Sequence, residues 1–257
     1  MEMKEGKKHF VLAHGACHGS WCWYKLATLL KSAGHRVTAL DLAASGINPK
    51  QVNDLRSFSD YFEPLMNFME HSLPAKERVI LVGHSMGGMG ISKAMESFPE
   101  KISFAVFLTA LMPGPTLDLS ALFQVGSRGD SIYTYDGEGL ENQPTTFIFG
   151  PKYISSYMYQ LCSPEDLSLA TMLLRPIRLY SEENPQNQIV LSQEKYGSVR
   201  RVYIMCDQDK ALPEDVQRLM IQNDPTIDVK VITGSDHMVM LSKPQELSAC
   251  LQEIAEA

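Results

Sequence analysis

Short apolar runs alternate with longer amphipathic segments along most of this chain. The runs have the length and composition of buried strands, and the longer segments have the apolar spacing of helices. We predict strands at residues 10–14, 37–42, 79–82, 104–109, 202–206 and 229–232. We predict helices at residues 21–32, 58–69, 86–96, 213–221 and 244–254. This alternation predicts an α/β fold in which helices cover both faces of a mostly parallel sheet.

The alternation stops between residues 113 and 190. This segment is rich in Ser, Gly, Pro and Tyr, and it contains helix-sized pieces but no clear buried strand. One piece, residues 164–174, looks helical, with Ser163 as its N-cap. We interpret residues 113–190 as a cap, or lid, inserted into a core that consists of residues 1–112 and 191–257. Such a cap would exclude water from the site beneath it and shape the pocket.

A serine between glycines follows the third predicted strand. The sequence there is Gly83-His84-Ser85-Met86-Gly87, a G-x-S-x-G pattern between a strand and a helix. Such a strand-turn-helix unit exposes the serine hydroxyl on a tight turn, where it acts as a nucleophile. Glycine-rich turns produce the same pattern by chance, so the context carries the prediction. We predict that Ser85 is a catalytic nucleophile.

An acid and a histidine complete the expected catalytic group. Asp209 and His237 each follow a predicted strand, which places both at the edge of the sheet where catalytic groups gather in open α/β folds. The chain order Ser, Asp, His is that of α/β-hydrolases and differs from the orders in chymotrypsin and subtilisin. Asp207 and Asp236 remain alternatives for the acid. We therefore predict an α/β-hydrolase fold with Ser85, Asp209 and His237 as its triad.

Two backbone amides are candidates for an oxyanion hole. The first predicted strand ends in a small-residue turn at Gly15 and Ala16, and Met86 directly follows the serine. In α/β-hydrolases the oxyanion hole uses the amide after the nucleophile and an amide from the loop after an early strand. We therefore predict that the N–H groups of Ala16 and Met86 are its donors. His18 and His84 lie beside these groups, and we interpret both as structural, hydrogen-bonding histidines.

Composition narrows the class of protein further. A net charge of −7 argues against a nucleic-acid partner. The sequence shows neither a membrane-spanning stretch nor the apolar region of a signal peptide, so we expect no membrane partner. Five scattered cysteines indicate reduced thiols and a cytoplasmic location. Since no Cys/His cluster has the spacing of metal ligands, we expect neither a metal nor a cofactor.

Several motifs together resemble one family. They are residues 9–19 (HFVLAHGACHG), 34–46 (GHRVTALDLAASG), 161–167 (LCSPEDL), 196–199 (YGSV) and 236–238 (DHM). The chain resembles the plant methylesterase family of the α/β-hydrolase superfamily, a group that includes salicylic acid-binding protein, polyneuridine aldehyde esterase, hydroxynitrile lyases and methyl ketone synthase. The resemblance covers nearly the whole chain. It implies a serine esterase that hydrolyses methyl esters of small carboxylic acids, such as plant hormones or specialised metabolites, through an acyl-enzyme, and it implies a homodimer.

Three positions separate the reactions within that family. The hydroxynitrile lyases carry a threonine in place of Gly15 and a lysine in place of Met238, and methyl ketone synthases carry an alanine in place of Ser85. This chain resembles the esterases at these positions. The lyase lysine stabilises departing cyanide, and a methionine thioether cannot supply that charge. A lyase or decarboxylase, and a small-molecule receptor built on a hydrolase scaffold, remain alternatives.

The substrate pocket is the least defined part of the prediction. Leu111 stands where some members of the resembled family carry an aromatic pocket residue, and methionines adapt to ligands of varied shape. We expect the small-molecule ester to contact six residues, namely Gly15, Leu111, Phe147, Phe149, Met158 and Met238.

Overall fold

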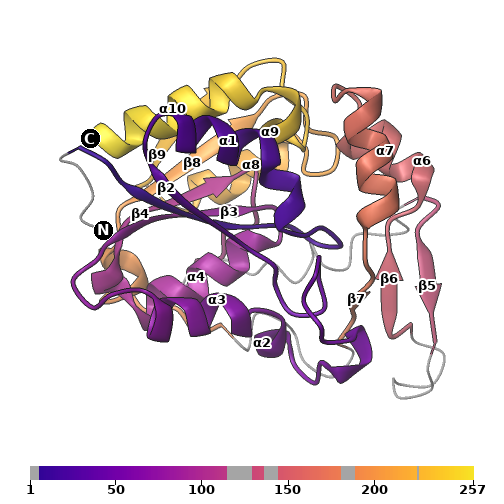
Figure 1. Ribbon diagram of the computed structural model, residues 1–257, viewed down its shortest axis with the longest axis horizontal. Coiled ribbons are helices and arrows are strands. Elements are labelled where there is room, and N and C mark those ends of the chain that lie inside the picture. Colours follow the sequence, from indigo (N-terminus) through magenta and orange to yellow (C-terminus); the bar gives the residue numbers. More distant parts are fainter. Residues whose placement is uncertain (1–5, 115–128, 136–143, 181–188, 225) are drawn as a thin grey trace.

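A six-stranded sheet forms the centre of the computed structural model, which describes residues 6–114, 129–135, 144–180, 189–224 and 226–257. Every neighbouring pair of its strands is parallel. Their order across the sheet is β2-β1-β3-β4-β8-β9 (Figure 1). The strands are β1 (His9–Ala13), β2 (Arg36–Leu40), β3 (Val79–His84), β4 (Ile102–Leu108), β8 (Arg201–Cys206) and β9 (Asp228–Ile232). All six predicted strands are therefore confirmed.

Helices cover both faces of this sheet, as predicted (Figure 1). On one face α1 (Tyr24–Ser32) packs against α10 (Pro244–Glu256), and α3 (Glu63–Asn67) and α4 (Gly87–Ser97) lie on the other. The core also contains α2 (Phe58–Tyr61), α8 (Glu214–Gln222) and α9 (Val239–Ser242). Short 3₁₀ helices lie at Ser20–Trp23, Val52–Asp54, Pro99–Lys101 and Tyr196–Ser198.

The predicted helix at residues 58–69 is wrong in one respect, because it is not continuous. It divides into α2, α3 and a π-helix at Phe68–Ser72. Pro64 has no backbone N–H and suits only the first turn of a helix, so a new helix begins beside it. The apolar spacing nevertheless identified the face that packs inward, since Phe58, Tyr61, Leu65 and Met69 are all buried.

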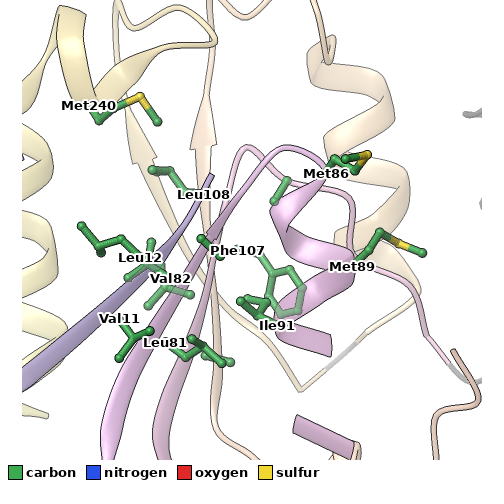
Figure 2. Close-up of a cluster of buried hydrophobic side chains, with 14 of the residues drawn as sticks. Val11, Leu12, Leu81, Val82, Met86, Met89, Ile91, Phe107, Leu108 and Met240 are labelled. Atoms are coloured by element: carbon green, nitrogen blue, oxygen red, sulfur yellow. The ribbon is translucent and has the colours of Figure 1, made fainter. Parts of the chain in front are cut away.

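Packing between the sheet and α4 fixes the ends of the segment that carries Ser85. The strand before the serine and the helix after it both contribute to one buried cluster (Figure 2). Its members include Val11, Leu12, Leu81, Val82, Met86, Met89, Ile91, Phe107 and Leu108. Because the side chains on both flanks are buried, the turn between them has little freedom to move.

Residues 113–190, which we call the inserted segment, lie between β4 and β8 in the chain and carry a sheet of their own. Its antiparallel strands are β5 (Ile132–Thr134), β6 (Thr146–Ile148) and β7 (Ile177–Arg178). Its described helices are α6 (Pro151–Tyr153), a π-helix at Ile154–Met158, and α7 (Pro164–Leu173). The expectation of no buried strand is wrong, because Phe147 lies in β6 and is buried; strands this short show no alternation in the sequence.

The prediction of a capped helix in the inserted segment is confirmed. Ser163 is the N-cap of α7, and its hydroxyl accepts a hydrogen bond from the backbone N–H of Asp166 at 3.2 Å. The carboxylate of Asp166 in turn receives Lys25 Nζ at 2.5 Å and the Tyr24 hydroxyl at 2.8 Å. Because Tyr24 and Lys25 belong to α1, this cluster joins the inserted segment to the core.

A second tie runs from the residues just after α7. The Arg175 guanidinium donates hydrogen bonds to the carbonyl oxygens of Gly46, Asn48 and Lys50, at 2.8 to 3.0 Å. These carbonyls belong to the loop that follows β2. Three charge-assisted bonds from one side chain hold that loop and the inserted segment together.

Candidate active site

Unusual backbone geometry is concentrated at one edge of the sheet. In the described part of the chain, four residues other than glycine have a positive φ, and each follows one of the four adjacent strands β1 to β4. They are Cys17 (φ 64°), Ala44 (58°), Ser85 (52°) and Thr109 (36°). Such conformations cost about 1–3 kcal/mol each, and they gather where a structure positions functional groups. The carboxyl edge of the sheet is therefore the candidate position of the active site.

Ser85 occupies a sharp turn between β3 and α4. Its left-handed backbone is held by its own carbonyl oxygen, which accepts the amides of Gly88 at 3.1 Å and Leu111 at 3.0 Å. The glycines around the serine are required by backbone contacts. A Cβ on Gly87 would lie 2.5 Å from the carbonyl oxygen of Ala13, and one on Gly88 would lie 2.1 Å from that of Leu111. This close packing gives the turn the geometry of a nucleophile elbow.

Gly15 lies directly against this serine. A Cβ built on Gly15 would be 2.8 Å from Ser85 Cβ and 3.3 Å from Ser85 Oγ. Those distances leave no room for a side chain beside the hydroxyl. A side chain at residue 15 would therefore require the loop after β1 or the serine to shift.

His237 and Asp209 form a buried hydrogen-bonded pair. His237 Nδ1 lies 2.6 Å from Asp209 Oδ2, and both side chains are almost fully buried. The hydroxyl of Thr109 donates to the same oxygen at 2.5 Å, while the amides of Ala211 and Leu212 donate to Oδ1 at 2.8 Å each. Four donors hold the carboxylate in one orientation.

The two alternative acids lie elsewhere in the hydrogen-bond network. Asp207 accepts the amide of Gly234 at 2.7 Å, so it holds the loop before His237. Asp236 accepts the amide of Leu161 at 2.8 Å and the Ser242 hydroxyl at 2.7 Å. Burial raises the pKa of Asp236. The geometry therefore favours Asp209 over both alternatives.

His84 connects the serine turn to His237. Its Nε2 lies 2.8 Å from the backbone carbonyl oxygen of His237, and the two rings are 4.6 Å apart. A carbonyl oxygen only accepts, so Nε2 carries the proton and the buried Nδ1 is left without a partner among the described residues. Burial, with a contribution from His237, lowers the pKa of His84 well below its usual value. The ring is neutral and orients its neighbour, as expected for a structural histidine.

Of the two predicted oxyanion donors, Met86 directly follows the serine and Ala16 follows the glycine that lies against it. Met86 is the N-cap of α4, and the first N–H groups of a helix have no acceptor within that helix. Ala16 follows Gly15 in the loop that touches Ser85. His14 holds this loop from the core: Leu42 donates its N–H to Nε2 at 3.1 Å, so the ring proton is on Nδ1 and points to the Gly15 carbonyl at 2.8 Å. Burial lowers the pKa of His14 to about 4.

The expected substrate contacts are mostly buried and apolar. Leu111 is fixed to the serine turn by its amide, and Met238 begins α9 directly after His237. In the inserted segment Phe147 approaches the loop after β1, because Cys17 Sγ lies 3.8 Å from its carbonyl oxygen. The ring of Phe149 is 5.3 Å from that of Phe147, and Met158 is buried at the end of the π-helix.

Three residues with clear contacts were missing from the sequence prediction. Thr109 binds Asp209, His14 binds the Gly15 carbonyl in the loop after β1, and Tyr159 binds His18 at 2.7 Å. The position of Thr109 at the end of a predicted strand could have identified it. Nothing in the sequence relates Tyr159 to a histidine 141 residues earlier.

The described residues offer little for other kinds of site. They contain no group of three or more His, Cys, Asp or Glu side chains arranged to hold a metal ion. The five cysteines are free thiols, as predicted. Within the described ranges no helix has both the length and the apolar character needed to cross a membrane.

Comparison with known proteins agrees with this architecture. The alpha/beta hydrolase family model matches residues 10–249. A methyl jasmonate esterase 1 from Vitis vinifera is 56% identical over 99% of both chains, and salicylic acid-binding protein 2 from Nicotiana tabacum is 51% identical over 98% of both. A crystal structure of tomato methylketone synthase I with 2-tridecanone superposes with a TM-score of 0.92 at 53% identity, covering 97% of this chain and 98% of the other. The chain belongs to the alpha/beta hydrolase family and, within it, to the plant methylesterase group.

Proposed function

We propose that this methylesterase hydrolyses its substrate through an acyl-enzyme formed on Ser85, with His237 as general base and Asp209 as the orienting acid. The observation that carries the proposal is the buried bond between His237 Nδ1 and Asp209 Oδ2 at the same sheet edge as the strained Ser85 turn. Because Nδ1–H donates to the carboxylate, the other ring nitrogen, Nε2, is free to accept a proton.

In the first step, His237 takes the hydroxyl proton of Ser85 as Oγ attacks the ester carbonyl. The Asp209 anion stabilises the imidazolium that forms. The amides of Ala16 and Met86 stabilise the negative oxygen of the tetrahedral intermediate, and one such donor contributes roughly 3 kcal/mol in related hydrolases. His237 then gives this proton to the departing methoxy oxygen as the C–O bond breaks, which releases methanol, and a water activated by the same histidine hydrolyses the acyl-enzyme.

The inserted segment would act as the cap that forms the acyl side of the pocket. Gly15, Leu111, Phe147, Phe149, Met158 and Met238 are its proposed lining. The buried, mostly apolar character of these residues suits an apolar acyl group more than a charged one. Free thiols suit a cytoplasmic location, and the homodimer remains a prediction that sedimentation would test.

Methanol release from a panel of methyl esters tests the reaction. The panel is methyl salicylate, methyl jasmonate, methyl indole-acetate and a β-keto methyl ester, each with wild type and Ser85→Ala. We expect wild-type methanol release and a loss of about 10⁴-fold or more in the variant, with the affinity for the product acid nearly unchanged. Wild-type turnover in Ser85→Ala would refute Ser85 as the nucleophile.

Two further readouts address the alternative reactions. The structural match to a methylketone synthase makes decarboxylation of a β-keto acid a specific second candidate, so the β-keto ester reaction is also assayed for ketone. Mandelonitrile cleavage tests the lyase alternative, which the neutral Met238 and the bare Gly15 disfavour. Binding without turnover of any compound would instead indicate a receptor.

A further inference from the structure

The loop that carries the Ala16 amide is held by the core on one side and by the inserted segment on the other. On the core side, His14 binds the Gly15 carbonyl. On the other side, His18 Nδ1 lies 2.8 Å from the Ala16 carbonyl oxygen, and His18 Nε2 lies 2.7 Å from the hydroxyl of Tyr159. The carbonyls of Gly15 and of Ala16 therefore each bind a buried histidine.

The direction of each bond in this second chain can be deduced. A carbonyl oxygen only accepts, so His18 Nδ1 carries the ring proton. Burial lowers the pKa of His18 to about 3, which keeps the ring neutral and leaves Nε2 as an acceptor. The hydroxyl of Tyr159 must then be the donor. The order of donation is Tyr159 O–H to His18, and His18 N–H to the Ala16 carbonyl.

Stacking fixes the plane of the His18 ring. The His18 ring stacks on Trp21, with ring centroids 5.3 Å apart and an interplanar angle of 27°. It also stacks on Tyr159, with centroids 5.9 Å apart and an angle of 8°. His18 is 1% exposed. A ring held by two aromatic neighbours and two hydrogen bonds has one orientation, so a displacement of Tyr159 would be transmitted to the Ala16 carbonyl.

The loop needs such support because it is strained. Cys17, directly after Ala16, is buried with a φ of 64°, a conformation that costs about 1–3 kcal/mol for a residue other than glycine. Two more contacts from the inserted segment reach the same residue. The amide of Arg175 donates to the Cys17 carbonyl at 3.0 Å, and Cys17 Sγ lies 3.8 Å from the Phe147 carbonyl oxygen.

We propose that His18 and Tyr159 are positioning residues for the oxyanion hole, through which the docked inserted segment aligns the loop that carries the Ala16 amide. Neither residue needs to touch the substrate for this role. The kinetic part of the inference rests on the proposed esterase function, whereas the mechanical part, the coupling of Tyr159 to the loop, does not.

The test compares four variants with wild type. Tyr159→Phe removes the hydroxyl and keeps the stacked ring. His18→Asn places an amide N–H near the position of Nδ1 and removes the acceptor for Tyr159. The double variant completes a cycle, and Tyr157→Phe is the matched control, since this half-exposed tyrosine lies two residues away in the adjoining π-helix.

Three measurements are made on each protein. They are kcat and KM for the best methyl ester, the inhibition constant of a trifluoromethyl ketone that forms an oxyanion adduct on the nucleophile, and hydrogen–deuterium exchange of the peptide that covers residues 9–20. We expect Tyr159→Phe to lower kcat about 10-fold, part of the 10²- to 10³-fold effect of losing an oxyanion donor. The affinity for the ketone should fall by the same factor, KM should change less than twofold, and hydrogen–deuterium exchange in the loop should rise.

The outcomes separate the coupling from the chemistry. If the coupling is real, His18→Asn matches Tyr159→Phe and the double variant is no worse than either, because one chain of bonds is broken in each case. The proposal would be overturned if Tyr159→Phe matched wild type in its kinetics, its affinity for the ketone and its hydrogen–deuterium exchange. A lower kcat without weaker ketone binding would also overturn it. If wild-type hydrolysis proves independent of Ser85, the proposed function fails, and the exchange data still decide whether Tyr159 holds the loop. Should His18→Asn fail to fold, Tyr159→Phe and its control carry the test.

Discussion

The core and the inserted segment build the site in different ways. In the core, Ser85, Asp209 and His237 follow β3, β8 and β9 of one parallel sheet, and backbone contacts hold them at the carboxyl edge. The inserted segment reaches the same edge through single side chains, such as those of Tyr159, Arg175 and Asp166. A site held by backbone contacts tolerates most substitutions except where there is no room for a larger side chain. A contact made by one side chain is lost when a substitution removes a single atom.

Of the substitutions that compare the two regions, we expect the largest loss of activity from one in the core. Gly15→Ala places a Cβ 2.8 Å from Ser85 Cβ, so the loop and the serine must move apart. Misplacement of reacting groups by about 1 Å costs about 10²-fold in rate. We expect kcat/KM for the methyl ester to fall by about 10²-fold or more while thermal stability changes little.

The matched control for Gly15→Ala is another buried glycine. A Cβ on Gly90, in α4, would lie 2.5 Å from the ring of Phe62, away from the catalytic groups. Gly90→Ala should therefore lower stability and leave kcat/KM near wild type. Equal activity losses in the two variants would show that the site responds to general disturbance of the core and would contradict the special role of Gly15.

The same division explains what the sequence could predict. The strands that precede Ser85 and Asp209 are buried apolar runs, and a serine between glycines is a local signal, so the fold class and a candidate triad could be predicted, although β9, before His237, is mostly exposed. Chain position favoured Asp209 over Asp207 and Asp236, and the direction of each carboxylate, which separates the three, is visible only in the structure. The break at Pro64 was visible as a residue type but was outweighed by the apolar spacing.

The inserted segment was less predictable for a physical reason. Its strands are two or three residues long, too short for an alternating pattern, and its contacts join residues far apart in the chain. Tyr159 and His18 are an example, because the sequence marked His18 as a hydrogen-bonding histidine but gave no sign of its partner. A capped helix was an exception, because the Ser163 cap and the helix it begins are a local signal.

A smaller effect is expected at the tie between α7 and α1. Asp166 is buried, and although burial raises its pKa, hydrogen bonds from Lys25, Tyr24 and Ser163 outweigh burial and lower it overall. Asp166→Asn removes the charge that Lys25 neutralises. Breaking a buried pair costs about 3–5 kcal/mol, but Lys25 is 29% exposed, so we expect a loss of about 2 kcal/mol in the free energy of unfolding.

Chemical denaturation measures that loss, and limited proteolysis shows where the chain opens. The control is Glu246→Gln, which removes the exposed partner of Lys243 and should change stability by less than about 0.5 kcal/mol. We expect faster cleavage within the inserted segment in Asp166→Asn alone. A stability change as small as that of the control would mean that the tie does not hold the segment.

The smallest effect concerns pH and compares the two histidines that bracket Ala16. His14 binds the core and His18 binds the inserted segment, and burial lowers their pKa values to about 4 and about 3, from 6.5. As pH falls below 6.5 the unfolded chain binds a proton at each, while the folded protein does not until these lower values. The stability from each ring is thus fully present above pH 6.5 and is lost as pH falls, at about 1.4 kcal/mol per pH unit.

Unfolding free energies at pH 7, 6 and 5 for wild type and His18→Asn separate the two contributions. Carboxylates and His14 affect both proteins alike, so the difference in slope below pH 6 reports His18 alone. We expect the variant's stability to decline less steeply, by about one proton, or 1.4 kcal/mol per pH unit. Equal slopes would mean that His18 takes up a proton in the folded protein as readily as in the unfolded chain. A protonated His18 ring has no nitrogen that can accept a hydrogen bond from the Tyr159 hydroxyl. The proposed chain of hydrogen bonds from Tyr159 through His18 to the Ala16 carbonyl would then not exist.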